Sequence, residues 1–272
     1  MEMIRLETYL SQFTDKSIGV AVYDLQTQRE IFIHADEMMH PASTMKVAVM
    51  AEVFHQAHEG RLTLDEPLKI VNSFKSIVDE SEFSLDVADD SDTSLYERIG
   101  QKESIRELTR LMIVRSSNLA TNLLLGRIGA GSVNRFIEEL GITGMNIVRG
   151  VEDKKAYERN LNNSASARGT TAMMRLITEG KVLSRQTCNK MIEIMLGQEF
   201  NESIPALLST SVKVAHKTGW IETFFHDTGI VFPQNRKPYA ITIFTHGFPE
   251  DDKNAAHACM AQISKMVYEE IV

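Results

Sequence analysis

Cysteine is scarce in this chain, and its scarcity excludes the small folds that depend on several disulfide bonds. Only Cys188 and Cys259 occur among 272 residues, and both lie in helix-like sequence. A pair so widely separated indicates neither a disulfide framework nor a cysteine-rich metal site. We therefore predict two free thiols that pack as small apolar residues, and we predict no metal and no cofactor.

Long apolar runs and an excess of positive charge are also missing. No run of 18 apolar residues is present, so the sequence indicates no membrane segment. The stretch Met1–Phe13 contains Glu2, Arg5 and Glu7 and no apolar run, which is not typical of a signal peptide. We therefore expect a cytoplasmic protein as the sequence stands, and an extracytoplasmic one only if a leader was removed. The formal charge of −8 disfavours a nucleic-acid partner.

The spacing of apolar residues predicts an α+β fold. Helical periodicity over Ile4–Phe13 precedes two short β-branched segments, and the spacing from about Gly60 to Thr210 is helical. After Ser211 the period returns to that of strands, followed by a last helix. The order predicts an antiparallel sheet built from both chain ends with packed helices, plus an all-helical lobe. The predicted strands are Ser17–Tyr23, Arg29–Ile33, Val212–Lys217, Phe225–Phe232 and Tyr239–Thr245.

We predict a single domain of two lobes, because no Pro/Gly/Ser-rich linker divides the chain. The α/β lobe comprises about residues 1–59 and 211–272, and the helical lobe comprises about residues 60–210. A substrate site is expected where the two lobes meet. The acidic stretch Asp79–Asp92 lacks the residue spacing of a calcium-binding loop, so we predict a solvated loop there.

The tetrapeptide Ser43-Thr44-Met45-Lys46 places a hydroxyl nucleophile and an amine one helical turn apart. An apolar helix follows to about His58, so Ser43 lies at the positive end of the helix dipole. An amine held in an apolar core has a lowered pKa and becomes able to accept the serine proton. Taken alone, the pattern also fits a helix that simply uses Ser43 as its N-cap.

Two further motifs strengthen the catalytic interpretation. Ser116-Ser117-Asn118 precedes an apolar helix, and Lys217-Thr218-Gly219 ends the first of the late strands. In this order the three motifs resemble the signature of the penicillin-recognising serine enzymes, which include the class A β-lactamases and the penicillin-binding proteins. The segments Asn118–Leu124 and Ala215–Trp220 are similar to those of class A β-lactamase-related serine hydrolases. The resemblance implies a two-lobe β-lactamase-like fold over essentially the whole chain.

The resemblance also implies a role for each motif residue. Ser43 would attack a carbonyl group with Lys46 as its base, and Ser116 would pass a proton to the leaving nitrogen. Asn118 would hold a side-chain amide of the substrate. In the third motif, Lys217 and Thr218 would bind a substrate carboxylate, and Gly219 would let the strand approach the substrate closely. The oxyanion donors would be the backbone N–H groups of Ser43 and Trp220.

Three departures from the family pattern stand out. Ser117 occupies a position where class A enzymes usually carry Asp, which could weaken a buried hydrogen bond. Trp220 replaces a small residue, which could narrow the pocket. The third departure concerns the loop that reads Arg-x-Glu-x-x-Leu-Asn in class A enzymes, because Ala156 stands where its anchoring Arg is expected.

That loop holds the general base for deacylation in class A enzymes. Glu158 and Asn162 match the second half of the pattern, so we predict that Glu158 activates the deacylating water with Asn162 beside it. Glu152, three residues after Arg149, is the alternative base. It has no Asn four residues further on, so we prefer Glu158.

The function implied is that of a serine hydrolase of the class A β-lactamase family. It would open β-lactam rings, or a related small amide or ester carrying a carboxylate, through a Ser43 acyl-enzyme. The alternatives are a D-alanyl-D-alanine carboxypeptidase or esterase, and a β-lactam-binding sensor that is acylated without turnover. A cell-wall substrate lies outside the membrane, and this conflicts with the missing leader.

Overall fold

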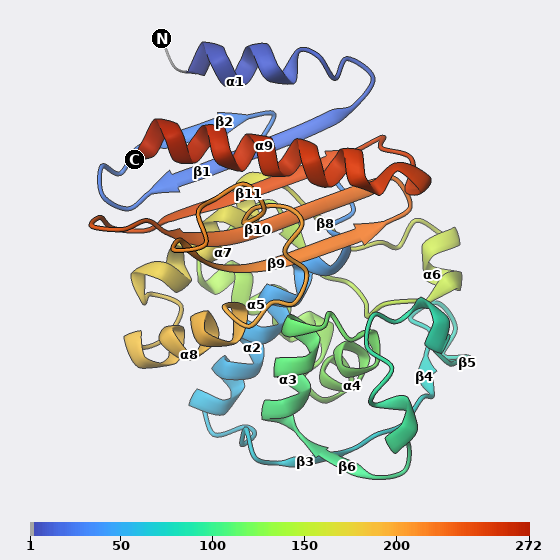
Figure 1. Cartoon of the computed structure of the whole chain (residues 1–272). Helices are drawn as coiled ribbons and strands as arrows, with labels where there is room; N and C mark the ends of the chain where they lie inside the picture. Colours follow the sequence, from blue (N-terminus) through green and yellow to red (C-terminus); the bar gives the residue numbers. More distant parts are fainter. Residues whose placement is uncertain (1–2) are drawn as a thin grey trace.

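A five-stranded antiparallel sheet forms the centre of the computed structural model, which describes residues 3–272 (Figure 1). Met1 and Glu2 belong to the first predicted lobe and lie outside the described residues. The strand order is β2-β1-β11-β10-β9, so both chain ends contribute neighbouring strands, as predicted. The strands are β1 (Ser17–Asp24), β2 (Glu30–Ile33), β9 (Lys213–Ile221), β10 (Phe224–Phe232) and β11 (Tyr239–His246).

The two faces of the sheet pack against different helices. Helices α1 (Met3–Leu10) and α9 (Lys253–Ile271) cover one face, and α7 (Ala167–Glu179) packs on the other (Figure 1). Alternate residues of β1 belong to separate cores: Val20 and Val22 face α1 and α9, whereas Ala21 and Tyr23 belong to the larger core with the remaining helices. The β-branched period-2 pattern therefore explains why this segment is a strand buried on both faces.

The second lobe is mainly helical, with three pairs of strands too short for their period to show in the sequence. The pairs are β3 (Pro67–Lys69) with β6 (Lys102–Ser104), β4 (Phe74–Lys75) with β5 (Glu82–Phe83), and β7 (Met145–Asn146) with β8 (Ser164–Ala165). The helices are η1 (Ala42–Met45), α2 (Lys46–His58), η2 (Val87–Asp89), η3 (Tyr96–Arg98), α3 (Ile105–Val114), α4 (Asn118–Ile128), α5 (Ala130–Glu139), α6 (Lys154–Glu158), α7 and α8 (Arg185–Met195); η4 (Glu250–Asp252) precedes α9.

Helix α2 leads from the sheet into this lobe (Figure 1) and is buried over most of its length, as its apolar composition predicts. Several predicted boundaries differ from the structure, most of them by one residue. Two of the differences bear on the site. The segment that begins the helix is a 3₁₀ turn, η1, and strand β9 continues past Gly219 to Ile221 because it pairs with β10 as far as Phe224.

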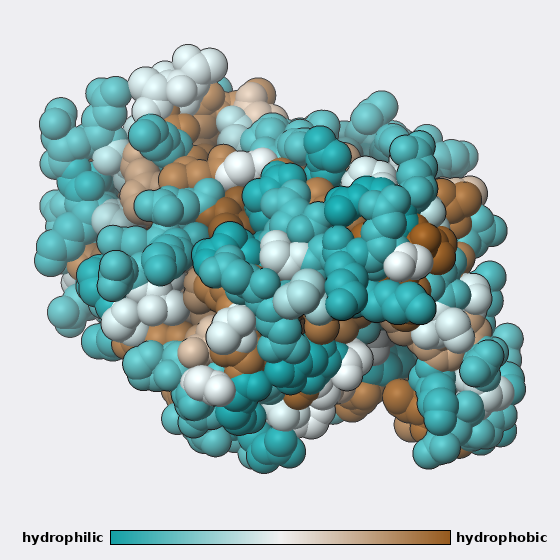
Figure 2. Space-filling view, turned by 90° about the horizontal axis from the view of Figure 1, so that it is seen from below, coloured by the Kyte–Doolittle hydropathy of each residue, from teal (hydrophilic) through white to brown (hydrophobic). Residues whose placement is uncertain are grey.

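The surface and the cysteines fit the composition. Cys188 and Cys259 are buried and free. Figure 2 shows a mostly hydrophilic face, seen from below the view of Figure 1, on which apolar residues are scattered. No helix among the described residues has both the length and the apolar character needed to cross a bilayer. Nor do the described residues include a group of three or more His, Cys, Asp or Glu side chains placed to hold a metal ion.

Candidate active site

Ser43 lies in the 3₁₀ turn η1, directly before α2. Side chains three residues apart align in a 3₁₀ turn, so Ser43 and Lys46 share one face. The Ser43 side chain is half-buried, and within residues 3–272 its hydroxyl makes no hydrogen bond. Its N–H group belongs to the first turn of a helix, where N–H groups lack partners within the helix. Ser43 therefore presents both an unengaged hydroxyl and a backbone donor.

The turn before Ser43 is strained and is held by two histidines. Ala42 adopts φ +47°, a conformation that costs energy for a residue with a Cβ, and its N–H donates to Nδ1 of His40 at 3.1 Å. His226 donates from Nε2 to the His40 carbonyl at 2.8 Å. Its other ring nitrogen, Nδ1, accepts from the Thr245 N–H. Burial lowers the pKa of His40 and of His226 to about 4, which keeps both rings neutral. The sequence motifs gave no sign of these supporting residues.

Lys46 is fully buried and connects the first motif to the second. Its Nζ donates to the Ser116 carbonyl at 2.7 Å, to Asn118 Oδ1 at 2.9 Å and to Ser116 Oγ at 3.3 Å. Burial lowers the pKa of Lys46 to about 7, while the nearby charges of Asp90 and Glu152 act in the opposite direction. A large fraction of this amine is therefore neutral near pH 7 and able to accept a proton.

Ser116 joins all three motifs through one hydroxyl. It lies between α3 and α4 at φ +58°, another strained position. Its Oγ accepts from Lys217 Nζ at 3.0 Å and from Lys46 Nζ at 3.3 Å. Because a hydroxyl has two lone pairs and one proton, two incoming donors leave the Ser116 O–H free to donate to a third group.

Asn118 joins Lys46 to a carboxylate. While its Oδ1 accepts from Lys46, its Nδ2 donates to Glu152 Oε1 at 2.8 Å. The other carboxylate oxygen of Glu152 accepts from the Asp86 N–H at 3.2 Å. Glu152 is half-buried at φ +61°, and burial raises its pKa above the usual range. A half-buried carboxylate with a raised pKa is therefore held near the buried amine of Lys46.

The structure does not bring Glu158 to this cluster. Glu158 is exposed at the end of α6 and makes no hydrogen bond or ion pair with a described residue. The geometry therefore corrects our preference and favours Glu152, the alternative base.

The loop has an arginine anchor, although Ala156 stands where the family pattern predicted one. Arg149 is buried and donates to the Leu161 carbonyl at 3.0 Å and to Asn162 Oδ1 at 2.6 Å. The side chain of Asn162 is thus engaged in holding Arg149, and Ala156 is not the anchoring position. The spacing of Arg149 three residues before Glu152, one more than in the family pattern, was the signal in the sequence.

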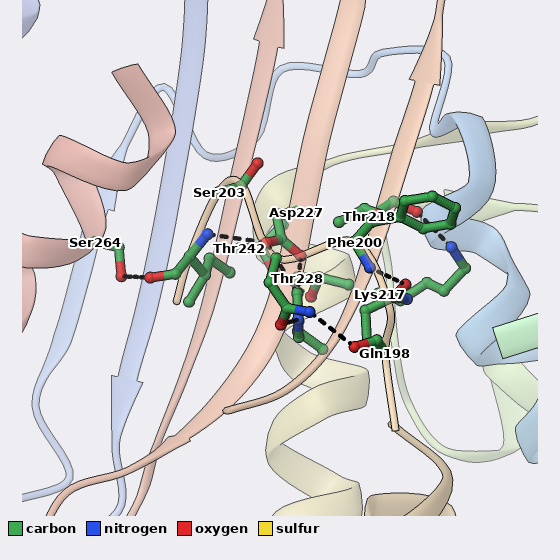
Figure 3. Close-up of polar contacts among 12 residues, drawn as sticks. Gln198, Phe200, Ser203, Lys217, Thr218, Asp227, Thr228, Thr242 and Ser264 are labelled. Carbon is green, nitrogen blue, oxygen red and sulfur yellow. Dashed lines mark hydrogen bonds and ion pairs between the residues drawn. The ribbon is translucent and has the colours of Figure 1, made fainter. Parts of the chain in front are cut away.

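Lys217 enters the site from the edge strand β9 and is fully buried. Its Nζ donates to Ser116 Oγ and to the Thr218 carbonyl, the latter at 2.7 Å. Burial and the neighbouring charge of Lys46 lower the pKa of Lys217, and Asp227 opposes that shift. Figure 3 shows Asp227 close by on β10, where it accepts from His216 Nδ1 at 3.0 Å. The buried contact between His216 and Asp227 therefore links β9 to β10.

The remaining residues of the third motif line the same strand. A Cβ at Gly219 would lie 2.7 Å from the Ser43 nitrogen and 2.9 Å from the Thr44 nitrogen, so only glycine allows this close approach. Thr218 is half-buried. Trp220 is 56% exposed, and its side chain therefore extends largely into solvent.

Comparisons with known proteins identify the family and the fold. The model of the β-lactamase enzyme family matches residues 4–271. The chain is 24% identical to the carbapenem-hydrolysing β-lactamase KPC of Klebsiella oxytoca, over 96% of this chain and 86% of that protein. Its fold is similar to that of PBP-A (TM-score 0.84, 25% identity, 98% of this chain and 94% of that one). It is also similar to a β-lactamase of Chitinophaga pinensis (TM-score 0.84, 20% identity, 100% and 99% covered).

Proposed function

Because the chain belongs to the β-lactamase enzyme family, we propose that it hydrolyses β-lactams, or a related small amide or ester, through an acyl-enzyme on Ser43. The observation that carries this proposal is the convergence of two buried lysines, Lys46 and Lys217, on the Ser116 hydroxyl. A structural site has no need of two buried amines facing one oxygen, because each loses its hydration there.

The same residues support an acylation step in which Ser43 is the nucleophile. Ser43 Oγ attacks the carbonyl carbon of the substrate, and its proton passes to the neutral amine of Lys46. The developing oxyanion is stabilised by the backbone N–H groups of Ser43 and Trp220. As the C–N or C–O bond breaks, the Ser116 O–H donates its proton to the leaving atom and recovers one from Lys46, whose Nζ lies 3.3 Å away. All protons are then accounted for.

Deacylation needs a water molecule and a second base. Glu152 takes one proton of that water as the water oxygen attacks the acyl carbon. The bond between the acyl carbon and the Ser43 oxygen then breaks, and the Ser43 oxygen receives the proton that Glu152 took from the water. Asn118 and the Asp86 N–H hold the two carboxylate oxygens of Glu152.

The buried amine of Lys217, with Thr218 beside it, suits a substrate that carries a carboxylate. Replacing Lys217 by Ala should therefore impair carboxylate substrates more than neutral esters. A lost charge-assisted contact costs about 1.5 to 3 kcal/mol, or about 10- to 150-fold in kcat/KM for the carboxylate series. The matched control is Lys213→Ala, at the exposed start of the same strand. Equal losses for both substrate types would refute the assignment.

Gly219→Ala should slow acylation by about 100-fold, because a displacement of the nucleophile by even 1 Å has effects of this size. The added methyl group would overlap the backbone of Ser43 and Thr44, which cannot move aside as a flexible side chain would. The rate of adduct formation measures the effect. Gly126→Ala is the control, since a Cβ there meets no atom within 4 Å. Parent-like acylation in Gly219→Ala would contradict the close approach.

One experiment tests the proposal as a whole. Incubation with benzylpenicillin, followed by intact-mass measurement over time, should show an adduct that forms and then disappears, and a chromogenic cephalosporin should be turned over. An adduct that persists, without cleavage of a D-alanyl-D-alanine peptide or a simple ester, would favour the β-lactam-binding sensor. Cleavage of that peptide or ester without turnover of the cephalosporin would favour the carboxypeptidase or esterase.

A further inference from the structure

The acidic stretch 79–92 contains a carboxylate that is buried, contrary to the solvated loop that its composition predicted. Asp90 is only 7% exposed. Its oxygens accept from the N–H groups of Asn118 and Leu119 at 2.9 Å each, and from the Tyr96 hydroxyl at 3.0 Å. These N–H groups open α4, so the Asp90 carboxylate lies at the positive end of that helix.

Ser117 does not provide this charge. As the N-cap residue of α4, its hydroxyl accepts from the Ala120 N–H at 3.3 Å and carries no charge. Class A enzymes usually carry Asp at this position. In this chain the carboxylate at the second motif therefore comes from a different segment, 28 residues before Asn118 in the sequence.

The contacts of Asp90 lead directly to both proposed bases. Asp90 fixes the backbone of Asn118, and the Asn118 side chain accepts from Lys46 and donates to Glu152. The same acidic segment also holds Glu152 through the Asp86 N–H. We propose that Asp90 is a positioning residue that aligns Lys46 and Glu152 through Asn118, replacing the acid that the second motif lacks. This inference rests on the proposed acyl-enzyme function.

If Asp90 acts partly through its charge, removing that charge changes the pKa of Lys46, which the loss of a purely structural contact would not do. The charged groups that face Lys46 are Asp90, Glu152 and, across the Ser116 hydroxyl, Lys217. The negative charge of Asp90 raises the pKa of Lys46 against the effect of burial. Without that charge the pKa of Lys46 falls, so its neutral form persists to lower pH. The acid limb of the acylation rate should then move to lower pH even as the maximal rate falls.

The experiment compares two neighbouring acids. Asp90→Asn should slow acylation by benzylpenicillin about tenfold or more and lower the midpoint of its acid limb by about half a pH unit or more. Asp89→Asn is the matched control, because that side chain is exposed and makes no hydrogen bond with a described residue. Adding Ser117→Asp to Asp90→Asn returns a carboxylate to the same helix end and should recover part of the lost rate.

Parent-like acylation with an unmoved midpoint in Asp90→Asn would overturn the inference, as would an equal effect of Asp89→Asn. If Asp90→Asn does not fold, Tyr96→Phe replaces it. That variant keeps the carboxylate but removes one of its donors, and it should slow acylation about two- to fivefold. A parent-like rate in Tyr96→Phe would then refute the inference.

A measurement without substrate separates this inference from the proposed function. The titration of Lys46 can be followed by NMR in the parent and in both Asn variants, using ¹³C-labelled lysine. A parent that forms no adduct overturns the acyl-enzyme function. The Lys46 titration would then still decide whether Asp90, and not Asp89, sets the charge of this amine: a lower midpoint only in Asp90→Asn supports the placement, and equal midpoints refute it.

Discussion

Ser43→Ala is expected to abolish the covalent adduct with benzylpenicillin and to reduce turnover of a chromogenic cephalosporin by about 10⁴- to 10⁶-fold, as for the loss of other serine nucleophiles. The reason is geometric. Ser43 has an unengaged, half-buried hydroxyl one turn before the buried Lys46, whereas the Ser116 oxygen already accepts from two lysines. The methyl group of Ala fits the same space, so the fold should be retained. Intact mass and peptide mapping provide the measurement.

Ser116→Ala is the informative comparison, because it removes a different hydroxyl from the same cluster. That variant should still be acylated on the peptide containing Ser43, only more slowly, since the leaving atom loses its proton donor. A label found on Ser116 or Ser117 in the parent, or an undiminished adduct in Ser43→Ala, would show that the nucleophile lies elsewhere.

The fold was largely predictable because its pattern is local. Alternating β-branched residues in β1 and the apolar composition of α2 each have a period that a short window reveals. The order of these elements along the chain then left few arrangements in which both chain ends share one sheet. Strands of two or three residues, such as β4 and β7, contain no full period and were missed.

The site was predictable where its residues follow one another in the sequence. Ser43 and Lys46 are one turn apart, and Ser116 lies two residues before Asn118, the first residue of α4, so the motifs themselves specify local geometry. Lys217 could be placed with them only through the family resemblance, because its contact with Ser116 spans 101 residues.

The predictions that differ from the structure concern contacts between distant segments of the chain. The loop that carries Glu152 and Glu158 is anchored by Arg149, whose guanidinium donates to Leu161 and Asn162, and no local pattern indicates these contacts. Likewise, Asp90 lies in a polar stretch that composition alone assigns to solvent. It is buried because the N-terminus of α4 supplies N–H donors to its carboxylate, which makes burial of the charge tolerable.

Glu152 and Glu158 also differ in their contacts with distant segments, and we expect their replacement to have very different effects on the lifetime of the acyl-enzyme. Glu152→Gln should lengthen the life of the acyl-enzyme by about 10² to 10⁴-fold, the usual contribution of a general base. Glutamine keeps the size of the side chain, and its amide oxygen can still accept from Asn118 Nδ2, but it cannot take a proton from water. Glu158→Gln is the matched control, because that carboxylate is exposed and does not contact the cluster.

The pH dependence of deacylation provides a second test of the same residue. Burial raises the pKa of Glu152, and only its ionised form can accept the proton of the water. As the pH falls through that raised pKa, the parent should lose deacylation at a higher pH than an ordinary glutamate would allow, and Glu152→Gln should lack this limb. Single-turnover decay of the penicilloyl adduct across the pH range measures both effects. If Glu158→Gln slows the decay and Glu152→Gln does not, the buried carboxylate beside Asn118 serves acylation or structure, and the water must be activated from the exposed end of α6.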